Sequence, residues 1–149
     1  MKLLLAASFV LTSPAFHANG PIPRAYTCDG RNASPPLRWT APPRGTSSLA
    51  LRVYDADARF THWVAWGISS RSRSLRAGAR PPHQGRNDFS QVGYEGPCPP
   101  KGKPHHYLFT LYALARALSP KGSNARAFNT ALAKAHPIST ATLTGTYGR

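Results

Sequence analysis

Acidic residues are scarce in this chain of 149 residues. Five carboxylate side chains stand against 19 lysines and arginines, so the formal net charge is +14. Such an excess of positive charge favours anionic partners: nucleic acid, an anionic lipid surface or a phosphorylated ligand. With so few acids, each one is expected to have a local role in a turn, an ion pair or a ligand contact. The five acids are Asp29, Asp55, Asp57, Asp88 and Glu95.

The basic residues are scattered along the chain, and aromatic residues are not interleaved with them. The one local concentration comprises Arg71, Arg73, Arg76 and Arg80. A dedicated nucleic-acid surface usually shows a clustered basic patch or a recognisable motif. We therefore expect no specific nucleic-acid partner. A solvated basic surface that binds no partner and a basic surface that binds an anionic partner are equally favoured alternatives.

Long hydrophobic runs are also absent. The run from Leu3 to Leu11 is far too short to span a bilayer, so we predict no transmembrane segment. After Met1-Lys2 it is typical of a secretory signal, and the alternative is a first β-strand over residues 9–12. The length favours one domain over residues 1–149, in which residues 1–8 are either a signal-like or a disordered extension.

Fifteen prolines and twelve glycines favour a loop-rich β protein over a helix bundle. Apolar patterns predict strands, and a capped apolar stripe predicts one helix from Ser123 or Asn124 to about Ala135. Residues 69–88 are predicted as loop. No βαβ alternation and no repeat is present, so the fold class is mostly β: a sandwich with one or two peripheral helices. The predicted strands cover residues 48–54, 62–68, 107–114 and 138–147.

Several catalytic motifs are missing. No Gly-x-Ser-x-Gly elbow marks a serine hydrolase, and the segment from Gly96 to Lys103 lacks the glycine spacing and the amide groups of a P-loop. His62, Cys98, His105 and His106 match no local metal-ligand spacing. We expect no metal, no other cofactor and no enzymatic activity. A weak hydrolase with His62 or His105 as general base is the least favoured alternative.

A stiff loop from Gly93 to Pro104 leads into a strongly apolar strand. Its prolines fix the backbone, so the residues at its exit are held in place. His105 and Tyr107 lie there, and other polar residues stand at the ends of neighbouring strands. Imidazolium and tyrosine hydroxyl groups donate hydrogen bonds to phosphate oxygens. The pattern predicts a small polar pocket formed with Asp55, Asp57 and His62, although each histidine alone could equally be structural.

The two cysteines, Cys28 and Cys98, both lie in turn-like segments. They are either a free pair or one disulfide, and the second alternative is favoured in an exported protein. A disulfide between them would tie the early loop to the pocket loop. By loop entropy it would contribute roughly 4 kcal/mol to stability.

Several segments together resemble the phosphatidylethanolamine-binding protein family, specifically its bacterial Raf-kinase-inhibitor-like branch. The resemblance covers nearly the whole chain, and its longer motifs are specific. The matching stretches are residues 11–16, 22–23, 26–30, 34–39, 55–58, 61–64, 84–89, 93–107 and 143–149.

The resemblance implies a Greek-key-like β-sandwich with a small anion pocket. It assigns ligand contacts to Asp55, Asp57, His62, His105 and Tyr107, and to the backbone near Cys98. The sequence departs from the family pattern in one connection: Ala56 and Arg59 replace two prolines, and the segment from Asp57 to His62 is shorter than usual. This departure bears on the identity of the ligand more than on the fold.

We therefore expect a non-enzymatic binding protein for a small anionic or phosphorylated ligand, such as a phospholipid head group. The alternative is a protein-interaction module that inhibits a kinase or a protease. The oligomeric state stays open between monomer and homodimer. The family match over Leu11 to Phe16 favours an uncleaved start and slightly favours the cytoplasm over the periplasm or secretion.

Overall fold

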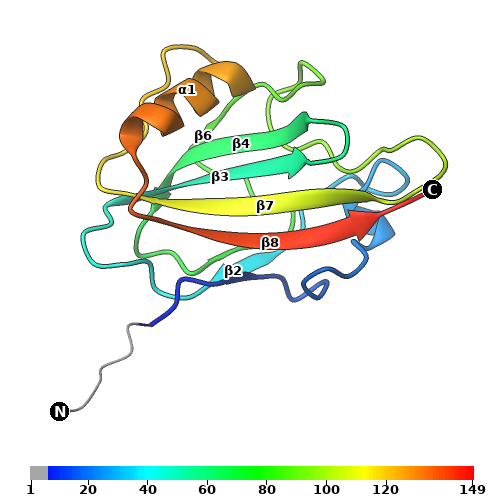
Figure 1. Ribbon diagram of the computed structural model, residues 1–149, viewed down its shortest axis with the longest axis horizontal. Helices are drawn as coiled ribbons and strands as arrows, with labels where there is room; N and C mark the ends of the chain where they lie inside the picture. The colour runs from blue at the N-terminus through cyan, green and yellow to red at the C-terminus, as the bar shows by residue number, and fades with distance from the viewer. Residues whose placement is uncertain (1–6) are drawn as a thin grey trace.

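The computed structural model describes residues 7–149 and contains two antiparallel sheets (Figure 1). The larger sheet has the strand order β6-β4-β3-β7-β8 and the smaller one the order β1-β2-β5. The strands are β1 Leu11–Thr12, β2 Leu37–Trp39, β3 Ser48–Asp55, β4 Phe60–Ser69, β5 Ser74–Leu75, β6 His83–Gln84, β7 His105–Leu114 and β8 Ser139–Tyr147. A 3-10 turn, η1, covers Arg24–Tyr26, and one α-helix, α1, covers Ala125–Ala135.

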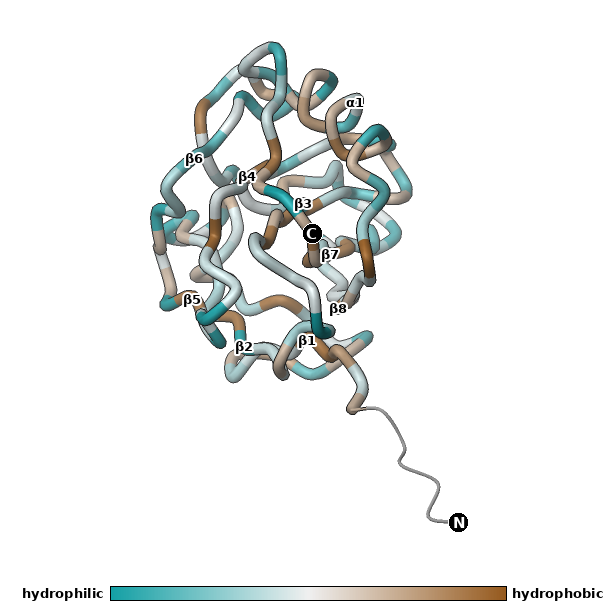
Figure 2. Tube along the Cα trace, turned by 90° about the vertical axis from the view of Figure 1, so that its left-hand side faces the viewer, coloured by the Kyte–Doolittle hydropathy of each residue, from teal (hydrophilic) through white to brown (hydrophobic). Residues whose placement is uncertain are grey.

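The elements form three layers. In the view of Figure 2 the small sheet and helix α1 lie on opposite sides of the large sheet. One apolar cluster fills the space between the two sheets, and a second lies between the large sheet and α1. The predicted fold class, a mostly β sandwich with a peripheral helix, is confirmed.

The long central strands form because both of their faces are apolar. In β3, Leu49, Leu51 and Val53 point into the cluster between the sheets, whereas Ala50 points towards α1. Strand β7 alternates in the same way, with Phe109 between the sheets and Leu114 under the helix. A strand that is covered on both sides has a continuous apolar run, and such runs in the sequence predicted these central strands.

Helix α1 begins and ends as the sequence pattern indicates. The side chain of Asn124 accepts a hydrogen bond from the Ala127 amide at 2.9 Å, which satisfies one of the free donors of the first turn. The buried stripe is Ala125, Phe128 and Leu132. The helix ends at His136, whose backbone is left-handed at φ 48°.

The structure corrects one sequence expectation, and a second lies largely outside the described residues. Residues 69–88 are not all loop, because the two-residue strands β5 and β6 extend the edges of the two sheets there. The expected signal-like or disordered extension over residues 1–8 lies largely outside the described residues. Of that stretch, the Ser8 carbonyl accepts a hydrogen bond from the Thr40 hydroxyl at 2.8 Å.

In the described part of the chain, the only α-helix has 11 residues, and none is long and apolar enough to cross a membrane. The first strand and its loop belong to the packed core. Leu11 and Phe16 are both buried between the sheets.

Candidate functional site

A β-bulge in β4 orients His62. Trp63 pairs with Val53, but Thr61 pairs with the next residue, Tyr54, so His62 is an extra residue in its strand. Without this insertion, strand alternation would turn His62 away from Trp63 and towards the helix side. The bulge places it instead on the side of the inter-sheet core.

Three strand ends meet around one small cavity. Asp55 closes β3, Phe60 opens β4, and His105 opens β7. Asp55 lies directly opposite Tyr107 in the β3–β7 register, and His105 lies two residues before Tyr107 on the same face. The cavity has a volume of about 180 Å³ and is lined by Asp55, Ala58, Phe60, His62, Phe89, Cys98, Pro99, Pro100, His105 and Tyr107.

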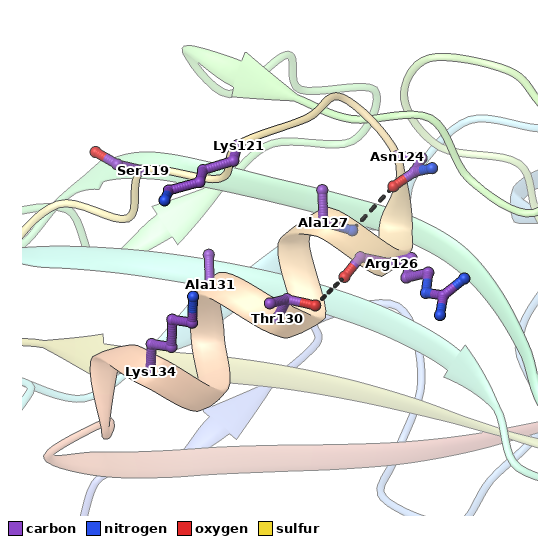
Figure 3. A pocket seen from close by; sticks show the side chains of 8 residues that line it. All are labelled: Ser119, Lys121, Asn124, Arg126, Ala127, Thr130, Ala131 and Lys134. Carbon is purple, nitrogen blue, oxygen red and sulfur yellow. Dashed lines mark hydrogen bonds between the residues drawn. The ribbon is translucent and has the colours of Figure 1, made fainter.

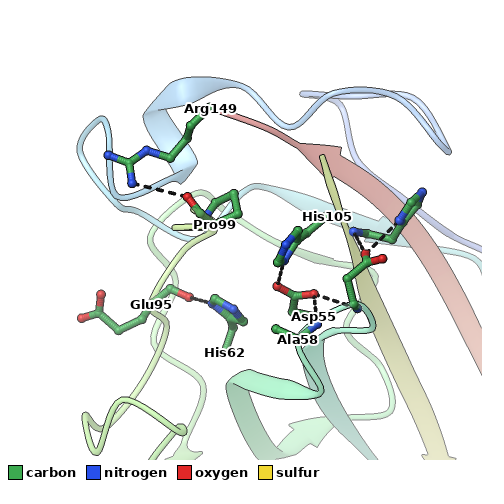
Figure 4. Close-up of polar contacts among 9 residues, drawn as sticks. Asp55, Ala58, His62, Glu95, Pro99, His105 and Arg149 are labelled. Carbon is green, nitrogen blue, oxygen red and sulfur yellow. Dashed lines mark hydrogen bonds and ion pairs between the residues drawn. The ribbon is translucent and has the colours of Figure 1, made fainter. Parts of the chain in front are cut away.

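The carboxylate of Asp55 uses both of its oxygens within the protein. Oδ2 lies 2.6 Å from Nδ1 of His105, and Oδ1 accepts the amides of Asp57 and Ala58 at 2.9 and 3.0 Å. The His105 ring is therefore held by its Nδ1, and its Nε2 is the polar atom left for the cavity (Figure 4). Asp55 positions a histidine rather than offering a free oxygen to a ligand.

His62 is held in the complementary way. Its Nδ1 lies 2.7 Å from the carbonyl oxygen of Glu95, which can only accept, so Nδ1 carries the proton and Nε2 is free (Figure 4). The rings of Phe60, Phe89 and Tyr107 pack edge-on around the imidazole at 5.3 to 5.4 Å between centroids. This burial lowers the pKa of His62 below its usual value, because the charged ring is poorly solvated there.

The hydroxyl group of Tyr107 has no partner among residues 7–149, although it is buried. Buried hydroxyl groups in native proteins are nearly always hydrogen-bonded, so an exception needs an explanation. Burial and the nearby charge of Asp55 raise the pKa of Tyr107, so the group keeps its proton. The Tyr107 hydroxyl is therefore a donor in the lining of the cavity, near the carboxylate of Asp55.

A disulfide fixes the loop that closes the cavity. Cys28 and Cys98 are joined, with their Cα atoms 5.4 Å apart and a sequence separation of 70. The sequence left open whether they pair. The bond attaches the cavity loop to the segment after η1, and the Cys28 amide adds a hydrogen bond to the Pro97 carbonyl at 3.1 Å.

Gly96 lets this loop lie against the segment that includes η1. A Cβ at Gly96 would come within 2.3 Å of the Tyr26 carbonyl oxygen and 2.9 Å of the Thr27 Cα. The amide of Gly96 donates to Oδ1 of Asn32 at 2.7 Å, and Nδ2 of Asn32 donates to Glu95 at 2.6 Å. The same loop therefore carries the Glu95 carbonyl that orients His62.

The end of β8 holds the far side of the loop. Arg149 contacts the Pro99 carbonyl at 3.4 Å (Figure 4). It also pairs with Asp29 at 3.2 Å. Tyr147 also donates to Asp29, at 2.6 Å. Through these contacts the cavity loop is held against the end of β8 and the turn that follows Cys28.

The structure gathers five of the six predicted ligand residues around the cavity: Asp55, His62, Cys98, His105 and Tyr107. The sixth, Asp57, lies outside it. Its Oδ2 accepts from the backbone amide and from Nδ1 of His106 at 2.6 and 2.9 Å. These bonds lower the pKa of Asp57 below its usual value. Asp57 therefore bonds within the turn beside the cavity, and the binding role of all six residues stays a prediction.

The loop contributes Cys98, Pro99 and Pro100 to the lining of the cavity. Pro99 and Pro100 line the cavity but have no amide hydrogen, so Cys98 is the one loop residue of the lining with an N–H group. The loop wall is therefore mostly apolar.

Sequence reasoning missed the aromatic part of the site. Phe60 and Phe89 pack at 4.6 Å between centroids and cover His62, yet they come from separate segments. Phe89 is 42% exposed at the cavity. In the sequence, the one signal for this aromatic part was that Phe89 stands alone in a polar stretch.

Arg59, the residue in the shortened connection, does not line the cavity. It has a left-handed backbone at φ 53° and borders a hollow beside α1 on the other side of the large sheet. Among residues 7–149, no three His, Cys, Asp or Glu side chains gather as a metal-binding group.

Comparisons with known proteins agree with this architecture. The model of the family described as "Phosphatidylethanolamine-binding protein" matches residues 12–148. A UPF0098 protein of Methanothermobacter thermautotrophicus is 41% identical over 149 residues, which cover 93% of this chain and 98% of the relative. The crystal structure of Escherichia coli YbcL, described as a new member of the mammalian PEBP family, superposes with a TM-score of 0.86 at 35% identity, covering 96% of this chain and 99% of YbcL. A Chlamydia trachomatis homologue of the same family superposes with a TM-score of 0.85 at 36% identity, covering 97% and 99%.

Proposed function

The chain belongs to the phosphatidylethanolamine-binding protein family, and we propose that its cavity binds the phosphate group of a small anionic ligand without turning it over. Family membership supports a binding role. The observation that carries the proposal is the hydroxyl group of Tyr107, which is buried at the cavity and has no hydrogen-bond partner among the described residues. A ligand oxygen would satisfy it.

Three donors of this chain would surround such an oxygen group. Tyr107 offers its hydroxyl. Nε2 of His62 and of His105 donates when the ring is in its imidazolium form, because Nδ1 of each ring is already bonded to Glu95 or Asp55. Phosphate oxygens accept several hydrogen bonds at once, and bonds to charged groups are stronger than those between neutral ones. The two oxygens of Asp55 are already occupied, so its charge is directed at backbone amides and at His105 rather than at the ligand.

The size of the cavity limits the ligand. About 180 Å³ lies below the range of roughly 300–1,000 Å³ that is usual for drug-sized ligands. It suits a phosphate or a head group, whereas acyl chains would remain outside. The apolar wall of Phe60, Phe89 and Pro99 excludes water around the donors and so strengthens their hydrogen bonds.

Binding is expected to take up a proton. Because burial lowers the pKa of His62, its ring is neutral at pH 7 and Nε2 can only accept. An anion beside Nε2 favours the imidazolium form and raises the pKa again. Affinity should therefore rise as the pH falls from about 8 to about 6, and the heat of binding should depend on the ionisation enthalpy of the buffer.

The test compares two tyrosine variants by titration calorimetry with inorganic phosphate and with phosphoethanolamine. Tyr107→Phe removes one oxygen atom and should weaken both ligands by roughly tenfold or more. Its stability should be unchanged or higher, since an unpartnered buried polar group is lost. The control, Tyr54→Phe, removes a hydroxyl from the α1 side of the sheet and should leave affinity unaltered.

Equal affinities for the wild-type protein and Tyr107→Phe would refute the proposal. A preference for phosphoethanolamine over phosphate would identify a head group, and equal binding would identify the phosphate alone as the recognised part.

A protein-interaction module is the second candidate, favoured by one observation. Phe89 is 42% and Val92 is 61% exposed; Phe89 lines the cavity, and Val92 follows three residues later along the chain. If a kinase or a protease docks there, Val92→Ser should abolish its inhibition while phosphate affinity is retained. Inhibition that survives Val92→Ser would exclude this surface.

A further inference from the structure

The outer side of α1 carries positive charge without compensation. Five cations border three adjoining hollows on this side, of about 300, 660 and 440 Å³. We call this surface the α1 face; its cations are Arg59, Arg116, Lys121, Arg126 and Lys134.

The cations of the α1 face are close enough to act together. Lys134 borders all three hollows, and Arg126 borders two of them. Arg126 and Lys134 are eight residues apart in one helix, which corresponds to about 12 Å along its axis. Figure 3 shows Lys121 on the loop across the first hollow from Lys134, with Arg126 extending at the start of the helix.

These side chains are not engaged elsewhere. Within the described part of the chain, Lys121, Arg126 and Lys134 form no ion pair, and their charged groups form no hydrogen bond. One carboxylate, Asp88, borders the face, and its Oδ2 accepts the Thr61 amide at 2.6 Å. All five cations are exposed, so their long stems can adapt to a surface.

We propose that the α1 face binds an anionic lipid bilayer surface through peripheral electrostatic contact. Clusters of lysine and arginine are attracted to anionic head groups by about 1 kcal/mol per residue, or about fivefold each. The side chains between the cations are small, such as Ala127, Ala131 and Thr130, so a broad anionic surface can approach them. The proposal is independent of any ligand in the cavity.

Two other anionic partners fit this face less well. Single-stranded nucleic acid stacks its bases on aromatic side chains, but Tyr54, the one aromatic residue bordering the hollows, is covered by the Arg52 guanidinium at 5.2 Å from its ring centre. A protein partner usually inserts bulky anchors into apolar pockets. The disulfide between Cys28 and Cys98 is typical of an oxidising compartment, where membrane surfaces are present and nucleic acid is uncommon.

The experiment measures co-sedimentation with vesicles of phosphatidylcholine, with and without phosphatidylglycerol, at low and at physiological salt. Phosphatidylethanolamine is omitted so that the cavity is not engaged by its named head group. The test variant is Lys121→Gln/Arg126→Gln/Lys134→Gln. The control removes equal charge from exposed arginines at the three-stranded sheet, on the opposite side of the molecule: Arg38→Gln/Arg71→Gln/Arg76→Gln.

We expect the wild-type protein to bind only the anionic vesicles, and to bind less at higher salt. The α1-face variant should bind about a hundredfold more weakly, whereas the control should stay close to wild type. Equal losses in both variants would overturn the proposal in favour of overall charge. Tighter binding to a thymidine oligonucleotide than to vesicles at the same salt would overturn it in favour of nucleic acid.

Tyr107→Phe separates this proposal from the proposed function. It should retain full vesicle binding while it loses phosphate affinity. Parallel loss of both would mean that lipid is bound through the cavity, and would also overturn the role of the α1 face.

Discussion

The cavity end and the α1 face of this protein arrange charge in different ways. All five carboxylates accept hydrogen bonds, and four of them, with the three ion pairs of the described residues, lie around the cavity end. The fifth, Asp88, borders the α1 face, and its Oδ2 is bonded to the Thr61 amide. On the α1 face, cations stand without carboxylate partners. The comparison indicates that the acids of this basic protein hold particular side chains and turns in place. The surplus positive charge lies on the α1 face, where it would attract an extended anionic surface.

The two regions also differ in how their backbone is held. Disulfide, proline and close backbone contact fix the cavity loop, while α1 is held by its buried apolar stripe and its cap. Changes to the backbone of the cavity loop should therefore affect phosphate binding and stability together. Changes to the backbone or the cap of α1 should affect stability and leave phosphate binding unaltered.

Removing the disulfide should have the largest effect. Cys28→Ser/Cys98→Ser should lower the free energy of unfolding by about 4 kcal/mol, because the unfolded chain regains the entropy of a long loop. Phosphate affinity should fall as well, since Pro99 and Pro100 lose their anchor. Urea denaturation and calorimetry measure the two effects. Reduction of the wild-type protein is the control, and a variant as stable as the oxidised protein would contradict the comparison.

A pair of glycine substitutions tests the backbone difference directly. Gly96→Ala should cost about 2–3 kcal/mol, because its Cβ would strike backbone atoms that cannot move independently. Gly122→Ala, before α1, would place its Cβ 3.1 Å from the Ala127 side chain and should change stability by no more than about 0.5 kcal/mol. Thermal unfolding measures the stability of both variants. Equal losses of stability would contradict the expected difference between the backbone of the cavity loop and that of the segment before α1.

The helix cap should matter less, and only for stability. Asn124→Ala should cost about 1 kcal/mol, since the Ala127 amide loses its acceptor. Asn124→Ser keeps an acceptor and should restore most of that loss. Phosphate affinity should remain at the wild-type value in both variants; a change in affinity would show that α1 and the cavity are coupled.

The smallest effect is the pH dependence contributed by His62. Burial lowers the folded-state pKa of this residue, so the unfolded chain takes up its proton first as the pH falls below about 6.5. This contribution to stability is present above that pH and is lost below it. Urea midpoints at about pH 7.5 and pH 5 should differ less for His62→Gln than for wild type. The lowered pKa of Asp57 acts only below about pH 4 and leaves this window untouched.

Much of the fold could be predicted from the sequence because its signals are local. The apolar runs of β3, β4, β7 and β8 and the capped stripe of α1 lie within one or two residues of their predicted bounds. The small strands β5 and β6 carried no such signal, since a two-residue strand forms only where a neighbouring edge is ready to pair with it.

The candidate site was predicted by residue type and by position at strand ends. Asp55, His105 and Tyr107 face one cavity because their strands pair in register. Asp57 lies outside the cavity lining for a reason that the sequence does not contain: it follows the end of β3, and the turn directs it to His106.

By itself, the sequence determined the mostly β composition, the stiff proline loop, the excess of positive charge and the few acids available to a site. The tertiary structure alone decided the side on which His62 projects, the pairing of Cys28 with Cys98 and the separation of acids from surplus cations. The physical reason is that the side of a strand on which a residue lies depends on its pairing partner. A bulge or a long-range contact sets that pairing across dozens of residues.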